Sequence, residues 1–156
     1  MQQKYVITPE VIEKLKNTIT NSDNKLTQLA GINVVELSER NVRLEMPLGD
    51  VHINHVGTAY AISMLMLVEI TGATLIRSTY GFTYTPIIKK IEISYLKPTK
   101  ETLVCELSIS KEDADRMITP IEERGRGNFL LPIILKDINN ETIAEANVLF
   151  YLLSVL

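Results

Sequence analysis

The sequence contains one long stretch, from Thr58 to Ile76, that is apolar around almost its whole circumference when it is read as a helix. Such a helix is either buried within a folded domain or inserted in a membrane. Glu69 lies well inside the stretch, and a charged side chain in lipid is costly and rare. The flanking segments have the strand-rich character of a soluble chain. We therefore expect a buried central helix and no membrane association.

Glu69 is the first candidate functional residue, because it is the one charged side chain inside this helix. Moving a carboxylate out of water costs several kcal/mol unless it is paired, protonated or left near solvent. One interpretation is a catalytic acid held against a substrate. The other is a structural acid that accepts a hydrogen bond from a neighbouring N–H group. The sequence leaves both interpretations open.

Length and charge narrow the class of protein. A chain of 156 residues is long enough for one domain with its own core. Its net charge of −3 argues against a nucleic-acid-binding protein. The single cysteine, Cys105, has no partner for an internal disulfide, and no signal-like segment follows Met1, so we expect a cytoplasmic protein. Asp50, His52 and His55 are too few for a metal site, so we expect no metal and no cofactor.

The remaining segments predict an α+β fold with antiparallel strands. Thr8-Pro9-Glu10 is typical of a helix start, and the segment from Lys25 closes at Gly31 as helices often do. Charged residues 112–127 interrupt the strands. The expected helices are 9–20, 25–30 and 58–76, and the expected strands are 32–37, 41–46, 79–96, 102–110, 129–135 and 143–153. We expect the sheet to wrap around the central helix.

Four short motifs, in this order and at this spacing, resemble the hotdog-fold thioesterases of the phenylacetate-pathway type and their relatives of unassigned function. They are Gly31-Ile32-Asn33-Val34-Val35-Glu36, Met46-Pro47, Asn54-His55-Val56-Gly57-Thr58 and Tyr95-Leu96-Lys97-Pro98. The resemblance covers the chain from about Leu29 onward. It implies a single hotdog domain over residues 1–156, with residues 1–30 as a helical lead-in.

The resemblance also implies a site at the start of the central helix. The family's acid falls on Glu69, its histidine on Tyr60, and its two glycines on Ala61 and Ile62. In the family, backbone N–H groups at the helix start hold the thioester oxygen, and the acid of a second subunit activates water or attacks the carbonyl. We therefore expect Glu69 and Asn54 as catalytic residues, and Gly57, Thr58, Tyr60, Ala61 and Ile62 around the oxyanion.

Basic residues offer a second prediction. Arg124 and Arg126, together with Lys97, are candidates to hold the phosphates of coenzyme A. The competing interpretation is ordinary solvated loop charge. The expected substrate is an acyl thioester of coenzyme A or of an acyl carrier protein, and the expected assembly is a homodimer or homotetramer.

Three hypotheses about function follow. The preferred one is a thioester hydrolase. The second is a non-catalytic protein that binds acyl-CoA or another small ligand, which the replacement of both helix-start glycines by Ala61 and Ile62 favours. The third is a dehydratase relative, for which His55 is the nearest histidine to the helix start.

Overall fold

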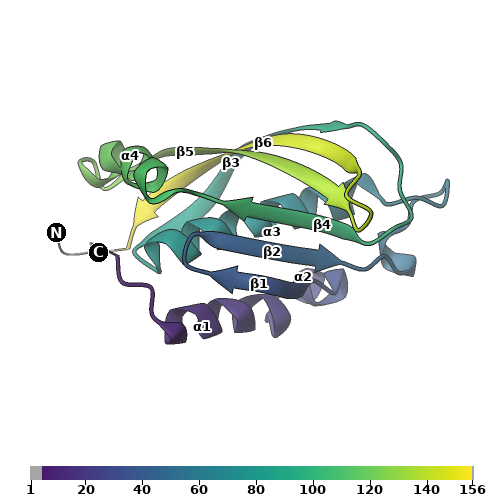
Figure 1. The fold of residues 1–156 in the computed structure, drawn as a ribbon, viewed down its shortest axis with the longest axis horizontal. Coiled ribbons are helices and arrows are strands. Elements are labelled where there is room, and N and C mark those ends of the chain that lie inside the picture. Colours follow the sequence, from purple (N-terminus) through teal and green to yellow (C-terminus); the bar gives the residue numbers. More distant parts are fainter. Residues whose placement is uncertain (1–4, 156) are drawn as a thin grey trace.

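The computed structural model describes residues 5–155, which form one sheet with four α-helices and a short 3₁₀ turn. The helices are α1 (Pro9–Thr20), α2 (Lys25–Ala30), α3 (Ala61–Tyr80) and α4 (Lys111–Glu122), and the 3₁₀ turn is η1 (Asp50–His52). The strands are β1 (Asn33–Ser38), β2 (Asn41–Met46), β3 (Tyr84–Tyr95), β4 (Leu103–Ser108), β5 (Arg126–Asp137) and β6 (Thr142–Ser154). The antiparallel order is β1-β2-β4-β5-β6-β3, and the sheet curves around α3 (Figure 1). This confirms the predicted α+β architecture.

Helix α3 forms the centre of the core. Leu67 and Val68 are completely buried, and they belong to one apolar cluster with Leu44, Leu103 and Phe150 of the sheet. Among residues 5–155, α3 is the helix with the length and hydropathy of a membrane span, and more than half of it is buried inside the fold. The buried central helix expected from the sequence is therefore present. Its outward face, described below, is less covered.

The two N-terminal helices begin and end where the sequence predicted. The Thr8 side chain accepts a hydrogen bond from the Val11 N–H at the start of α1, and the Asn24 side chain caps α2. Gly31 ends α2 with a positive φ of 58°, a conformation that glycine adopts at little cost. Helix α1 lies beside β1 at one edge of the sheet (Figure 1).

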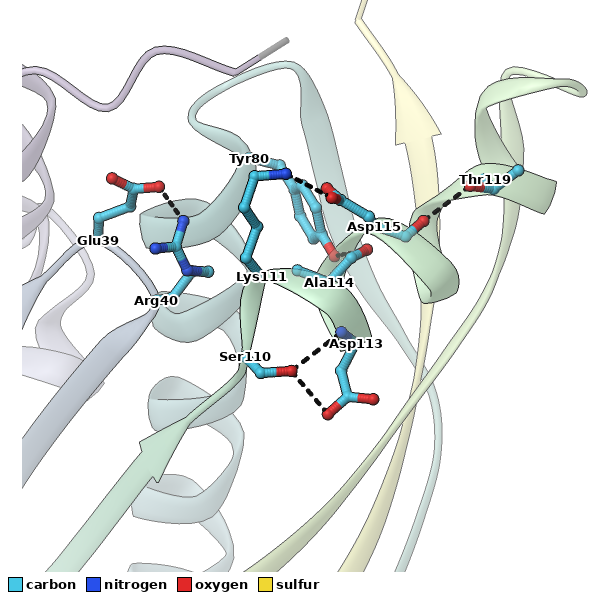
Figure 2. Close-up of polar contacts among 9 residues, drawn as sticks. All are labelled: Glu39, Arg40, Tyr80, Ser110, Lys111, Asp113, Ala114, Asp115 and Thr119. Atoms are coloured by element: carbon cyan, nitrogen blue, oxygen red, sulfur yellow. Dashed lines mark hydrogen bonds and ion pairs between the residues drawn. The ribbon is translucent and has the colours of Figure 1, made fainter. Parts of the chain in front are cut away.

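Helix α4 was missed by the sequence analysis, which treated residues 112–127 as a charged interruption. The Ser110 side chain caps it, and Ala114, Ile118 and Ile121 are buried on one face at helical spacing. Pro120 and the many charges obscured this pattern. Proline has no N–H group, so it removes one backbone hydrogen bond from the last turn of α4. Figure 2 shows the Tyr80 hydroxyl at the end of α3 donating to the Ala114 carbonyl at 2.8 Å.

The boundary between α3 and β3 also differs from the prediction. The helix continues to Tyr80, so the strand begins only at Tyr84 rather than at residue 79. A bulge between Ile88 and Lys90 then reverses which face of the strand points inward. Ile87 is therefore 46% exposed, whereas Ile91 packs against the core, although an even number of residues separates them and a regular strand would turn both to the same face.

Gly72 allows α3 to approach the sheet closely. A Cβ atom at this position would lie 2.8 Å from the Phe150 ring and 3.3 Å from Ile133 Cδ1.

We expect Gly72→Ala to lower the free energy of unfolding by about 1–3 kcal/mol because the overpacking outweighs alanine's better helix propensity. Urea unfolding followed by circular dichroism measures this. Adding Phe150→Leu relieves the contact, so the double variant should lose less than the sum of the two single losses. A fully stable Gly72→Ala protein would contradict this packing.

Candidate active site at the start of the central helix

The loop before α3 is organised by Asn54. The Asn54 Oδ1 atom accepts hydrogen bonds from the N–H groups of Val56 and Thr58 at 3.1 and 3.0 Å, and its Nδ2 donates to the Thr58 hydroxyl at 3.0 Å. Gly57 turns the chain with a φ of +79°. This loop delays the start of the helix from the predicted Thr58 to Ala61. The Asn54 side chain thus holds the loop rather than pointing away from it.

Two backbone N–H groups at the start of α3 remain free. The N–H groups of Gly57 and Thr58 donate to Asn54, and that of Tyr60 donates to the His52 carbonyl at 2.7 Å. By contrast, the N–H groups of Ala61 and Ile62 have no acceptor within residues 5–155. They lie at the positive end of a 20-residue helix, where unpaired donors bind anions and polarised carbonyl oxygens. Of the five predicted oxyanion residues, these two offer the donors.

His52 joins this region to α2. Its Nδ1 accepts from the Gly49 N–H at 2.9 Å, and its Nε2 donates to the Ala30 carbonyl at 2.9 Å. Both ring nitrogens are therefore occupied by the backbone, and the ring is buried. The His55 side chain is exposed. Of Asp50, His52 and His55, it is His52 whose side chain joins the loop to α2.

Glu69 lies on the outward face of α3 and is partly buried. Within residues 5–155 its carboxylate has no hydrogen bond and no ion pair. Burial raises its pKa above the ordinary value, since a desolvated carboxylate is harder to ionise. The side chain lines a cavity of about 260 Å³ between α3 and the α1–α2 region.

The free amides and the carboxylate are separated along the helix. Glu69 lies eight positions after Ala61 and seven after Ile62, which corresponds to roughly 11–12 Å along the helix axis. Within one chain they cannot both contact the same carbonyl group. Both nevertheless belong to the less covered face of α3, which also presents Leu65 and Met66.

Two further cavities flank the helix start. One, of about 260 Å³, lies between the start of α3 and the end of β3 and is lined by Asn54, Ala61, Met64, Tyr95 and Lys97 among others. The other, of about 310 Å³, lies between α2 and α3 and includes Tyr60 and Ile62 in its wall. The free amides are therefore placed between two spaces that open on either side of the helix.

The three predicted basic residues are not brought together within a chain. The Lys97 side chain forms an ion pair with Glu141, and the Lys97 backbone N–H donates to the Ile143 carbonyl at the start of β6. Arg126 pairs with Leu153 near the other end of the same strand. Ten residues of strand span about 33 Å. Only Lys97 lies beside the helix start, so the predicted rim of Lys97, Arg124 and Arg126 does not form one cluster.

Two parts of the site were missed by sequence reasoning. The Tyr95 hydroxyl donates to the Ala61 carbonyl at 3.2 Å, which fixes the end of β3 against the first turn of α3. The motif that contains Tyr95 was noted as the end of a strand and could have raised this question. Helix α2 supplies Leu26 and Leu29 to a cavity wall, and no local sequence signal indicates that contact.

Comparison with known proteins supports the fold and the family. Residues 26–152 match the family described as "Domain of unknown function (DUF4442)". No curated protein matches the sequence. The Pseudomonas aeruginosa protein PA5026, described as a protein of unknown function and a probable thioesterase, is similar with 26% identity and a TM-score of 0.84, covering 96% of this chain and 99% of that one.

More distant structures show the same fold. The Haemophilus influenzae thioesterase HI1161 has 14% identity and a TM-score of 0.72, covering 100% of this chain and 97% of its own. The Streptococcus mutans protein smu.793, solved bound to acetyl-CoA, has 16% identity and a TM-score of 0.62, covering 79% of this chain and 89% of its own. The chain therefore belongs to the DUF4442 family and has the hotdog fold of its thioesterase-like structural relatives.

Proposed function

We propose that the protein hydrolyses acyl-CoA thioesters at a site formed between two copies of the chain. The observation that carries this proposal is that α3 presents two kinds of polar group that lack hydrogen-bond partners within residues 5–155. Within the part of the chain that the structure describes, the Glu69 carboxylate is partly buried and has no partner, and the N–H groups of Ala61 and Ile62 are free. Each is half of a thioester-cleaving site, and one chain cannot close them onto the same carbonyl.

A two-fold symmetric dimer completes the site. If two α3 helices pack antiparallel across an axis near Leu65, residues 61–62 of one protomer lie level with residue 69 of the other. Leu65 is partly exposed on this face. Strand β3 is 12 residues long and lies at the sheet edge, so its outer side has unpaired backbone groups that can join a second β3. Both features favour the same seam.

The chemistry needs only these groups and water. The Glu69 carboxylate takes a proton from a water molecule as the water oxygen bonds to the thioester carbon. The partner protomer's amides at residues 61 and 62 donate hydrogen bonds to the oxyanion that forms. The carbon–sulfur bond then breaks, and the proton leaves with the thiol. Asn54 acts as a positioning residue, because its hydrogen bonds set where the helix starts.

Coenzyme A is favoured over a carrier protein as the thiol. Two of the structural relatives were solved with acetyl-CoA or coenzyme A. Lys97 lies in the wall of the cavity beside Ala61 and Tyr95, at a position from which its ammonium group can meet a phosphate. Its present partner, Glu141, is exposed, so exchanging this ion pair for a phosphate contact costs little.

The second candidate function is non-catalytic binding of an acyl-CoA. The exposed Ile62 side chain, 53% accessible, stands beside the amides where the resembling family has glycine. A side chain there narrows the approach to the backbone. A protein of this kind would bind acyl-CoA without releasing free thiol.

Glu69→Gln removes the proton acceptor and keeps the size of the side chain. We expect kcat for acyl-CoA hydrolysis to fall by about 10²–10⁴-fold with little change in substrate binding. Thiol release detected with a chromogenic disulfide measures the rate. Glu13→Gln, at an exposed position of α1, is the matched control and should keep wild-type turnover. A fully active Glu69→Gln enzyme would remove Glu69 from the reaction.

Ala61→Pro deletes one of the two free donors with minimal damage, because proline is favoured at the first position of a helix and Tyr60 already has the extended conformation that precedes proline. We expect a loss of about 10²–10³-fold in kcat. Ala61→Gly keeps the N–H group and should stay within about threefold of wild type. Equal activities of the two variants would show that this amide does not hold the oxyanion.

The raised pKa of Glu69 has two consequences with opposite signs. Catalysis needs the carboxylate, so the acid limb of the kcat/KM profile should have its midpoint above the ordinary glutamate pKa of 4.5. The free energy of unfolding should fall over the same pH range in which activity rises. The folded state holds the proton more tightly than the unfolded state, so the wild type loses stability as pH rises from 4.5 through the folded pKa.

Glu69→Gln lacks this titration. Its melting temperature relative to wild type should therefore increase as pH is raised across that range, whereas Glu13→Gln should follow the wild type. A difference between Glu69→Gln and wild type that is constant with pH would contradict the burial of this carboxylate.

A further inference from the structure

The cavity between α2 and the first half of α3 has the character of a binding site for hydrocarbon. Its volume is about 310 Å³, within the range of small-molecule sites. Apolar side chains dominate its wall, namely Leu26, Leu29, Met46, Val51, Ile62 and Met66. The one histidine in the wall, His52, has both ring nitrogens bonded to the backbone. It has no free nitrogen with which to recognise a polar ligand.

Helix α2 forms one wall of the cavity. Hydrogen bonds fix the position of this helix, although its apolar side chains are exposed to solvent. Leu26 and Leu29 are 60% and 61% exposed on a helix of only six residues. Asn24 caps the start of this helix, Gly31 ends it, and the His52 ring bonds the Ala30 carbonyl at its last residue. A short helix fixed at both ends that turns two leucines toward a cavity is suited to cover a flexible apolar ligand.

The position of the cavity identifies the part of the ligand that it takes. Tyr60 and Ile62 belong to its wall, and the free N–H groups of Ala61 and Ile62 lie at this turn of α3. A thioester oxygen held by those amides leaves the two arms of the thioester to run to either side of the helix start. The cavity on the other side contains Lys97 and suits the coenzyme A arm. Figure 1 shows α2 at the end of the molecule where α3 begins.

We propose, building on the hydrolase function above, that this cavity is the acyl pocket, that α2 sets its length, and that the substrates are unbranched aliphatic acyl-CoAs of medium chain length. A methylene group is similar in size to a water molecule, whose share of liquid volume is about 30 Å³, so the cavity holds a chain of up to about ten carbons. Met46 and Met66 in the wall adapt to a flexible chain.

Leu29→Trp tests the pocket, since it adds bulk to the α2 wall at an exposed position that tolerates change. Leu130→Trp, at a 50% exposed leucine on the outer face of β5, is the matched control. Two quantities are measured on each protein. One is kcat/KM for acetyl-, butyryl-, octanoyl-, dodecanoyl- and palmitoyl-CoA, with phenylacetyl-CoA beside them. The other is the Kd of the hydrolysis-resistant thioether S-octyl-CoA by calorimetry.

In the wild type we expect kcat/KM to rise by about fourfold per added methylene until the pocket is full, and then to level off. Leu29→Trp should lower kcat/KM for octanoyl-CoA and weaken S-octyl-CoA binding by at least about tenfold, with acetyl-CoA changed by less than about twofold. Leu130→Trp should leave the profile unchanged. A chain-length profile that Leu29→Trp does not alter, or a preference for phenylacetyl-CoA over octanoyl-CoA, would overturn the proposal.

The two measurements separate this inference from the proposed function. If no thioester is hydrolysed but Leu29→Trp still weakens S-octyl-CoA binding, the pocket stands and the hydrolase falls. Light scattering addresses the competing occupant, a second copy of the chain. A change in assembly on Leu29→Trp with an unaltered S-octyl-CoA affinity would assign this face to contact between copies and overturn the acyl pocket.

Discussion

Burial of α3 against the curved sheet is the constraint on which the rest of the structure depends. The helix is apolar enough to fill the concave side of the sheet, and Gly72 lets it approach the Phe150 ring more closely than a larger residue would. One helix covers only part of such a surface. Helices α1 and α2 cover the β1 side, whereas the part of α3 around Ile62 and Leu65 is less covered and, within residues 5–155, the outer edge of β3 pairs with no other strand. Those uncovered elements carry the groups that we assign to function.

The same constraint explains why the proposed site needs two chains. A helix that spans the core separates its first turn from its middle, so residues 61 and 62 are about 11–12 Å from residue 69 along the helix axis. When two such helices pack antiparallel, the amides of each chain lie beside Glu69 of the other chain. The two-fold axis therefore creates two equivalent sites. Partial burial of the Glu69 carboxylate costs folding free energy. The same desolvation raises its pKa and so makes the ionised carboxylate a stronger base.

The fold was largely predictable because its signals are local. Thr8-Pro9, Asn24, Gly31 and the alternation in β2 each specify an element through capping, turn or strand chemistry that the sequence displays directly. Helix α4 was missed because Pro120 and its charges conceal a short apolar face. The reversal of β3 was missed because a bulge at Lys89 is set by pairing with β6, which is not a local property.

The candidate site was predictable only in outline. Glu69 is visible in the sequence as a charge in an apolar helix, but which amides are free depends on the hydrogen bonds of Asn54 and His52, and these exist only in three dimensions. The separation of Lys97 from Arg126 within one chain was not visible in the sequence for the same reason, since their neighbours Ile143 and Leu153 lie near opposite ends of β6.

The central claim, that one chain supplies the amides and another the carboxylate, is tested most directly by mixing two inactive proteins. Ala61→Pro and Glu69→Gln chains are unfolded together, refolded at equal amounts and assayed for thiol release. If the site spans the two chains, half of the dimers are mixed, and each of these has one site with both groups intact. Activity should then return to about a quarter of the wild-type level. If both groups act within one chain, every site carries a defect, and a mixture as inactive as its components would contradict the proposed site.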